Sequence, residues 1–220
     1  MAFVAEKKLI IAKENEDAQE IKRVVSIEEE KAATEAADVK SVKDEADADL
    51  AVALPALDEA VRAVKKIDVN NFYELKGVSS PGPAIVACFQ VVLVFFPKCG
   101  KPKKPTDEKK KAVDPEGWWE LAKKELLGNP KAFLADLIAY DKDNIPDDLI
   151  RKVRPMMEWE TMSEAKIKNA SVALVAVRLW ANAMITYSDV LKIVGPKRII
   201  VAEKTIQLEK VMKSLNEKRA

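Results

Sequence analysis

The apolar positions between residues 1 and 76 follow the period of one long, solvated helix. This stretch contains no glycine and one proline, Pro55, and Glu, Lys, Ala and Asp dominate it. Its apolar residues recur every three or four positions, which is the seven-residue pattern of a coiled coil, with one four-residue stutter between Ala46 and Leu54. The predicted seam consists of Val39, Val42, Ala46, Leu50, Leu54, Leu57, Val61 and Val64.

The end of the chain, 196–220, repeats this pattern in a shorter arm. Val201, Leu208 and Leu215 are seven residues apart, and Val211 lies between the last two. We predict that this arm runs antiparallel to the first and pairs with the stretch from about residue 39 to residue 67, which leaves residues 1–38 without a partner. Pro55 and Pro196 are expected to break the two arms at their inner ends and to serve as hinges of the stalk that the arms form.

The region between the arms has the mixed composition of a compact helical bundle. The run 84–96 is apolar except for Gln90, so it is expected to be the central helix. Further helices are predicted from their caps and apolar faces over 68–77, 118–127, 131–140 and 146–154.

A longer helix is predicted at the end of this bundle. Thr161 and Glu164 have the spacing of a capping box, and no breaker follows them before Gly195 and Pro196. The stretch 161–194 is therefore expected to form one helix that this Gly-Pro pair ends.

Together these elements predict an all-α fold in which a small helical bundle caps an antiparallel two-stranded coiled coil. The predicted parts are a first coiled-coil helix over 1–66, a globular head over 67–195 and a second coiled-coil helix over 196–220.

The segment 97–117 interrupts the head with a composition of its own. It holds four prolines, two glycines and seven lysines against four acidic residues, a local charge of 7 − 4 = +3. We expect it to be an exposed, basic loop or mobile ribbon rather than a helix. Among its lysines, the predicted flap residues are Lys101, Lys103, Lys104, Lys109, Lys110 and Lys111.

Composition excludes several classes of function. The net charge of +1 provides no global basic field for nucleic acid, so an acidic partner would have to meet a local patch. The absence of histidine removes the commonest general base and zinc ligand.

Cys88 and Cys99 give no reason to expect a disulfide, and no cleavable signal opens the chain. The apolar run 84–96 is too short for a bilayer, which needs about 20 residues.

No motif in the sequence supports catalysis, a metal or a cofactor. The run that starts at Asp141 has Pro146 where a calcium loop requires glycine. The run Gly195-Pro196-Lys197 resembles only the end of a phosphate-binding loop, because no further glycine and no strand precede it as that loop requires. Trp118 and Trp119 could stack on bases, but core packing or anchoring of a loop is the stronger interpretation. We expect a protein part without enzymatic activity.

Basic residues gather where the predicted arms meet the head. They are Lys65, Lys66 and Lys76 on one side and Lys192, Lys197 and Arg198 on the other. One interpretation is that they are solvated helix ends, where lysine is favoured. The other is that they form a docking face for an acidic partner.

Several segments resemble the stalk and microtubule-binding domain of dynein heavy chains over nearly the whole chain. The resemblance is carried by 51–60 around Pro55, by 80–86, by 140–146, and by 179–184 leading to Tyr187 and to 194–198. The tryptophan pair, the segment 140–146 and the Lys-rich flap are more similar to the axonemal dyneins of cilia and flagella than to the cytoplasmic ones. The resemblance implies a helical head on an antiparallel coiled coil, which binds the α/β-tubulin junction and whose affinity follows the sliding of one stalk helix against the other.

Matched by position, the resemblance implies a set of microtubule-binding residues. They are Lys66 and Lys76 on the first head helix, Lys123 and Lys124 on the third, and Lys197 and Arg198 after Pro196. This chain departs from the cytoplasmic pattern in having Asp68-Val69 in place of a basic pair and Gly195 in place of an acidic residue. The charged residues of the switch in those relatives are therefore absent at these positions.

The resemblance implies a non-catalytic, microtubule-binding module of a dynein motor in the cytoplasm, on the ciliary or flagellar axoneme of the cytoskeleton. Its partners would be α/β-tubulin and, through the stalk, the rest of the heavy chain, whose ATPase lies outside this sequence. No nucleic acid, membrane or cofactor is expected. The alternative is a structural antiparallel coiled-coil adaptor whose head binds another helical protein.

Overall fold

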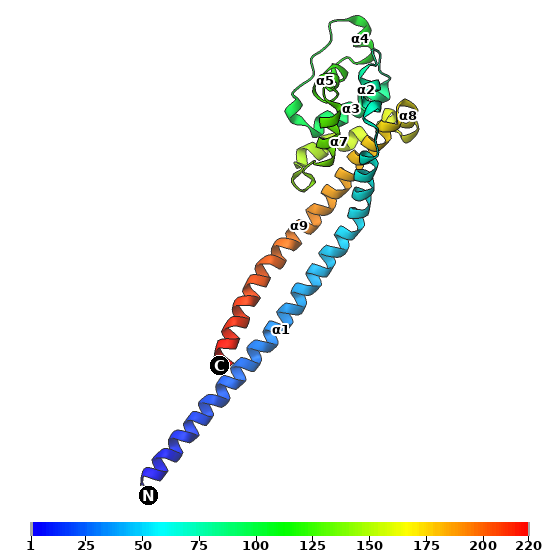
Figure 1. Cartoon of the computed structure of the whole chain (residues 1–220). Helices are drawn as coiled ribbons and strands as arrows, with labels where there is room; N and C mark the ends of the chain where they lie inside the picture. The colour runs from blue at the N-terminus through cyan, green and yellow to red at the C-terminus, as the bar shows by residue number, and fades with distance from the viewer. Residues whose placement is uncertain (1, 220) are drawn as a thin grey trace. The chain divides into compact units, whose positions relative to one another are not determined.

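The structure is a computed structural model that describes the backbone of residues 2–219 and the side chains of residues 11–218. Over this part of the chain the secondary structure is helical, with no strand, so the predicted all-α class is confirmed. Within the same residues, no helix is both long and apolar enough to cross a membrane. Figure 1 shows the order of the helices along the chain.

The chain divides into two compact units. The first, called the paired-helix unit, contains the residues up to Asp49 and those from Ile193 onward. The second, called the head unit, is Leu50–Lys192. Each of the two longest helices contributes to both units, namely α1 (Ala2–Lys65) and α9 (Val172–Arg219).

Both predicted proline breaks are wrong, because α1 continues through Pro55 and α9 continues through Gly195 and Pro196. A proline inside a helix loses one backbone hydrogen bond and costs about 3 kcal/mol. Burial of neighbouring side chains offsets this cost, since Ala53 and Leu57 lie on either side of Pro55 and are almost fully buried.

The predicted seam of α1 needs a correction in its inner half. The buried residues are Ala46, Leu50, Ala53, Leu57, Ala60 and Val64, whereas Leu54 is 39% exposed and Val61 is half-buried. The two four-residue steps from Val42 to Leu50 exceed two helical turns by about 0.8 residue, so the three-residue step to Ala53 returns the stripe to the same face. The two successive four-residue steps therefore fall between Val42 and Leu50, before the predicted position of the stutter.

Within the paired-helix unit α1 and α9 run antiparallel, as Figure 1 shows. Lys218 of α9 forms an ion pair with Glu28 of α1, and Lys197 forms one with Asp49. Leu215 is buried in one cluster with Val25 and Ala32. The sequence 197–218 therefore pairs with 28–49.

The predicted pairing with 39–67 is wrong, and so is the prediction that residues before 39 have no partner. The reason is that α9 does not end at Pro196 and that the inner stretches of both long helices, 50–65 of α1 and 172–192 of α9, belong to the head unit. The stretch after Pro196 consequently meets an earlier part of α1. The start of α1 extends past the last turn of α9 (Figure 1), and there Ile11 and Ile21 are each 56% exposed.

The head unit is built around α3 (Pro83–Phe95), as the apolar run predicts. Ten of its side chains are buried, and it contacts α5 (Trp118–Glu125), α7 (Asp147–Met157) and α8 (Glu164–Ala170). Two further helices of the head unit, α2 (Val69–Lys76) and α6 (Pro130–Ile138), contact each other. Helices are thus confirmed in the predicted ranges 68–77, 84–96, 118–127, 131–140 and 146–154.

The prediction of one helix over 161–194 is wrong. Thr161 lies in the short 3-10 turn η3 (Glu160–Met162), α8 follows, and Ser171 adopts an extended conformation with φ −169° and ψ 138° before α9 begins. Ser163, and not Thr161, precedes α8 as its N-cap residue. The buried side chains of Met162 and Ile167 hold this bend against the core.

Aromatic rings hold α9 to the rest of the head unit. Trp180 is fully buried, its ring lies 5.1 Å from Phe95 and 5.3 Å from Tyr140, and its indole N–H donates to the Leu137 carbonyl at 2.9 Å. The Tyr140 hydroxyl donates to the Phe95 carbonyl at 3.2 Å. The fixed core thereby defines where the surface helices α2 and α5 lie.

Candidate functional site

The first head helix, α2, ends at Lys76, which is a predicted site residue. Asp68 caps α2 by accepting a hydrogen bond from the backbone N–H of Asn70 at 2.9 Å. Phe72 anchors the helix, because it is fully buried and its ring lies 5.2 Å from that of Phe133 on α6. Two other side chains of α2 remain accessible, because Tyr73 is 48% exposed and Lys76 is exposed.

Lys76 meets the turn between α5 and α6. Its Nζ donates to the Gly128 carbonyl at 3.4 Å. A Cβ at Gly128 would lie 2.3 Å from the Lys124 carbonyl oxygen, so only glycine fits the tight turn after α5. The structure thus brings Lys76 together with the end of α5, where Lys123 and Lys124 lie. We call these three lysines the basic corner.

Two lysines of the basic corner have carboxylate partners. Lys123 pairs with Glu120 at 2.9 Å and lies 5.7 Å from the Trp119 ring centroid. Its hydrogen bond, together with that of Lys110, lowers the pKa of Glu120. Lys124 pairs with Glu125 at 2.7 Å, which raises the pKa of Lys124. The Lys124 side chain is 80% exposed, and such a pair contributes little, so an acidic partner can replace Glu125.

Lys66, another predicted site residue, lies in the turn between α1 and α2 and is exposed. Its backbone N–H closes the end of α1 by donating to the carbonyls of Arg62 and Ala63 at 3.2 Å. The side chain is available to a partner from this turn.

Lys197 and Arg198 belong to the paired-helix unit. Lys197 Nζ lies 2.9 Å from Asp49 Oδ2 and 3.3 Å from Glu45 Oε2, and the pKa of Lys197 is raised by these carboxylates, mainly by Asp49. Arg198 is exposed, and no hydrogen bond or ion pair of its side chain occurs among the residues that the structure describes. Sequence reasoning missed Glu45 and Asp49 as partners, because only the register of the helices reveals them.

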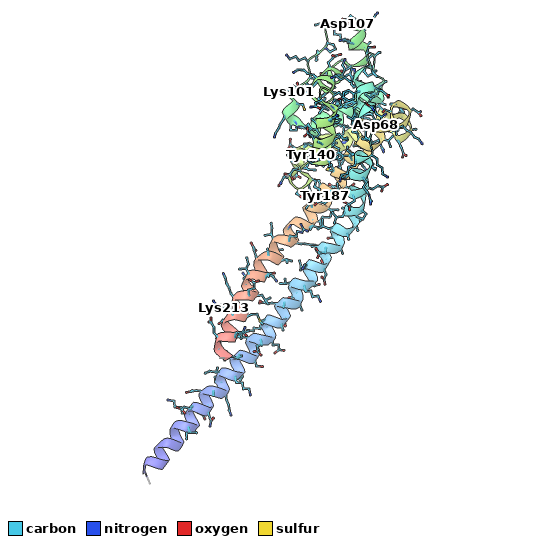
Figure 2. The ribbon with its side chains drawn as sticks, in the orientation of Figure 1. Asp68, Lys101, Asp107, Tyr140, Tyr187 and Lys213 are labelled. Atoms are coloured by element: carbon cyan, nitrogen blue, oxygen red, sulfur yellow. The ribbon has the colours of Figure 1, made fainter. Side chains whose placement is uncertain are left out.

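The segment 97–117 forms a flap on the head unit, and it contains more structure than the prediction of a loop or ribbon allowed. A 3-10 turn, η1 (Pro97–Cys99), opens it, and the short helix α4 (Glu108–Val113) follows. Asp107 starts α4 by accepting from the backbone N–H of Lys109 at 2.8 Å. In Figure 2, Lys101 lies on the first limb of the flap and Asp107 lies at its tip.

The base of the flap is tied to the head unit through Asp114, which is only 6% exposed. Its carboxylate accepts from the backbone N–H groups of Gly117 at 3.1 Å and Trp119 at 2.7 Å. The Trp119 indole N–H donates to the Val78 carbonyl at 3.2 Å, and its ring lies 5.5 Å from Phe89. Core packing of this tryptophan is therefore confirmed.

A sequence signal for this anchor exists. Asp114, Pro115 and Gly117 have the spacing that type I turns favour at their first, second and fourth positions. In the structure the Gly117 N–H donates to the Asp114 carbonyl at 3.3 Å, as in such a turn.

Three flap lysines form exposed ion pairs. Lys104 pairs with Glu116, Lys110 with Glu120, and Lys111 with Glu108. Lys101, Lys103 and Lys109 are exposed. In the described part of the chain, no ion pair involves any of these last three side chains. The flap consequently presents uncompensated positive charge.

The carboxylates of the run that starts at Asp141 form hydrogen bonds within the chain. Asp141 uses its carboxylate within the chain, where it accepts from the Asp143 backbone N–H and the Asn144 side chain. Asp143 in turn accepts from the Tyr187 hydroxyl at 2.7 Å. Among the described residues, no group of three or more acidic, cysteine or histidine side chains is arranged to hold a metal ion. Cys88 and Cys99 are both free thiols.

The fold and the basic corner define a class of protein: a helical head with surface lysines, together with an antiparallel helix pair. The sequence model of the family described as "Microtubule-binding stalk of dynein motor" matches residues 3–220. This chain therefore belongs to the dynein microtubule-binding stalk family.

Among the curated relatives that match are dynein chains of axonemes and flagella. Dynein axonemal heavy chain 3 of Mus musculus is 33% identical over 208 residues, which cover 94% of this chain and 5% of the relative. Dynein axonemal heavy chain 1 of Homo sapiens is 33% identical over 200 residues, 91% of this chain and 5% of the relative. The flagellar outer arm dynein gamma chain of Chlamydomonas reinhardtii is 29% identical over 199 residues, 90% of this chain and 4% of the relative.

Proposed function

We propose that this chain is the track-binding part of an axonemal dynein motor and that the basic corner of its head unit contacts the acidic surface of the microtubule at α/β-tubulin. The family match over residues 3–220 carries the proposal. The exposed lysines of α2 and α5 support the choice of surface, because an acidic polymer attracts clustered cations that are free to exchange their partners. Lys66 and the flap lysines add to the same positive field.

Arg198 stands as a separate contact in this proposal, because it is exposed and lacks a described partner. Lys197 has a different role, since its ammonium is held by two carboxylates of α1. Lys123 contributes less than Lys76 and Lys124, because Glu120 and the Trp119 ring already engage it.

The chain spans 4–5% of the length of the relatives described above, so the motor activity belongs to the rest of the protein in this proposal. We propose that the ATPase lies there and that this part is not catalytic. The relatives' names place them in axonemes and flagellar outer arms, which supports a ciliary or flagellar location. The register of the paired helices would transmit the state of the motor to the head.

Co-sedimentation with polymerised tubulin tests the proposal. The chain should enter the pellet with microtubules and stay in the supernatant without them. Added salt should weaken binding, because exposed charges are screened over about 8 Å at physiological ionic strength. A chain that remains in the supernatant at low salt, with its helices intact by circular dichroism, contradicts the proposal.

A further inference from the structure

The flap and the loop 77–82, which joins α2 to α3, line one cavity of about 290 Å³. The loop provides Ser79 and Ser80, and α4 of the flap provides Lys109 and Lys110. All four residues belong to the head unit. Two hydroxyl groups and two ammonium groups, which come from distant parts of the sequence, therefore border the same small space.

Ser80 carries the sequence signal of this cavity. It is the only serine or threonine in the chain that a proline follows. Ser80 is exposed, whereas Pro81 is buried and holds the loop against the head unit. Gly82 has open space beside it, since no atom lies within 4 Å of an added Cβ. The loop thus presents to solvent the Ser-Pro dipeptide that proline-directed protein kinases modify.

Three carboxylates also line the cavity, and each of them already has a partner. Asp107 and Asp114 accept hydrogen bonds from backbone N–H groups. Glu120 is held by two lysines, Lys123 at 2.9 Å and Lys110 at 3.2 Å. Glu120 would consequently keep one cation if Lys110 turned toward another anion.

Lys109 differs from Lys110 in having no ion pair within the described part of the chain, and both lysines are exposed. A phosphate ester on Ser80 would therefore meet one ammonium group without a carboxylate partner and a second one that Glu120 can release. Its charge of about −2 and its three acceptor oxygens suit charge-assisted hydrogen bonds to two lysines.

We propose that Ser80 is a phosphorylation site and that its phosphate binds Lys109 and Lys110, which holds the flap against the loop 77–82. In the modification, Ser80 Oγ forms a bond to the γ-phosphorus of ATP as the bond from that phosphorus to the β,γ-bridging oxygen breaks. ADP leaves, and the hydroxyl proton passes to a base of the kinase.

A consequence of this modification concerns the charge of the flap. The segment 97–117 has a local charge of 7 − 4 = +3, and a phosphate of about −2 would cancel most of it. Phosphorylation would thereby weaken the attraction of the flap to an acidic polymer, a regulatory role that rests on the proposed function. The modification site itself does not depend on it.

The first experiment treats the whole chain with ATP and a proline-directed serine/threonine kinase that is active on a Ser-Pro peptide. Mass spectrometry should find one phosphate per chain, located on Ser80, and Ser80→Ala should take up none. A chain that the active kinase leaves unmodified, or modifies only at other residues, overturns the site.

The second experiment measures backbone hydrogen exchange of α4 by mass spectrometry in the phosphorylated and unphosphorylated chains. Phosphorylation should slow this exchange by about threefold to tenfold, the range of two exposed charge contacts. In Lys109→Ala/Lys110→Ala, phosphorylated on Ser80, the slowing should be lost.

Lys103→Ala/Lys104→Ala is the matched control. It removes the same charge from the flap, and it also combines a lysine without a described ion pair and one that pairs with a glutamate. Phosphorylation should still slow exchange in this variant. If exchange does not slow in the wild type, or slows equally in both variants, the phosphate does not bind Lys109 and Lys110. Neither experiment contains tubulin, so these outcomes are separate from a failure of microtubule binding.

Discussion

The backbone N–H of Trp119 donates to the carboxylate of Asp114 across 2.7 Å, and this hydrogen bond joins the flap to the first turn of α5. Asp114 is buried, and its other carboxylate oxygen accepts from Gly117. The flap is therefore a charged segment whose base is fixed to the head unit. Changes at its tip should consequently have little effect on the stability of the head.

The position of this anchor predicts that two flap deletions will differ. Replacing 101–112 with a short Gly-Ser linker keeps Asp114, and we expect the melting temperature to change little, because the removed side chains are exposed or half-buried. Replacing 99–114 removes Asp114 and should cost about 1–3 kcal/mol, since the Gly117 and Trp119 N–H groups lose their acceptor. Thermal unfolding followed by circular dichroism checks both. Equal melting temperatures would show that Asp114 does not anchor the flap.

Gly117 should tolerate no side chain. Its φ of 84° lies in the left-handed region, and a Cβ there would lie 2.0 Å from the Lys103 carbonyl oxygen. We expect Gly117→Ala to lower the free energy of unfolding by about 1–3 kcal/mol, because the backbone must move. Gly82→Ala is the control, since φ at Gly82 is −67° and no atom lies within 4 Å of the added Cβ. Denaturant titration should show the larger loss at Gly117, and similar losses would contradict the close packing of the two flap limbs.

Burial of Cys88 should make the stability of the chain fall at alkaline pH. Desolvation raises the pKa of this thiol from 9.0 to about 12. Above pH 9 the unfolded chain releases the thiol proton while the folded chain retains it, so the free energy of unfolding decreases as pH rises.

The measurement is urea unfolding of the wild type and Cys88→Ala between pH 8 and pH 10.5. The variant should show the shallower decrease, by at most about 1.4 kcal/mol per pH unit. Tyr140, whose pKa is also raised to about 12 by burial, contributes the same sign to both proteins and cancels in the comparison. Parallel curves would mean that the Cys88 thiol is not held in its neutral form.

The sequence predicts short-range features of this fold well and long-range ones poorly. The caps and apolar faces that predict α2, α3 and α6 are local signals, and these helices form where they are predicted. Pro55 and Pro196 mislead, because a local rule for proline cannot account for the side chains packed on either side of it.

The candidate site was predictable in its residue types but not in its pairings. Clustered lysines are visible in the sequence, yet the register that gives Lys197 two carboxylates depends on residues about 150 positions away. The contact of Lys76 with Gly128 likewise joins residues 52 positions apart. Contacts between residues so far apart in the sequence become visible only in the tertiary structure, since no local pattern encodes them.

The role of the basic corner predicts a specific loss of binding. In Lys76→Glu/Lys124→Glu, two exposed cations become anions next to Glu125, and the surface should repel an acidic polymer. Lys168→Glu/Lys213→Glu is a matched control, because both lysines are exposed and carry the same charge change elsewhere on the chain. Circular dichroism should show that both variants keep their helices.

The most direct test of the account is the microtubule affinity of these two variants beside the wild type, measured by co-sedimentation at one low salt concentration. The account predicts a drop of at least about tenfold for Lys76→Glu/Lys124→Glu, or about 1.4 kcal/mol, and a change of less than about threefold for Lys168→Glu/Lys213→Glu. If both variants bind as the wild type does, or if both lose affinity equally, the basic corner is not the surface that contacts the microtubule.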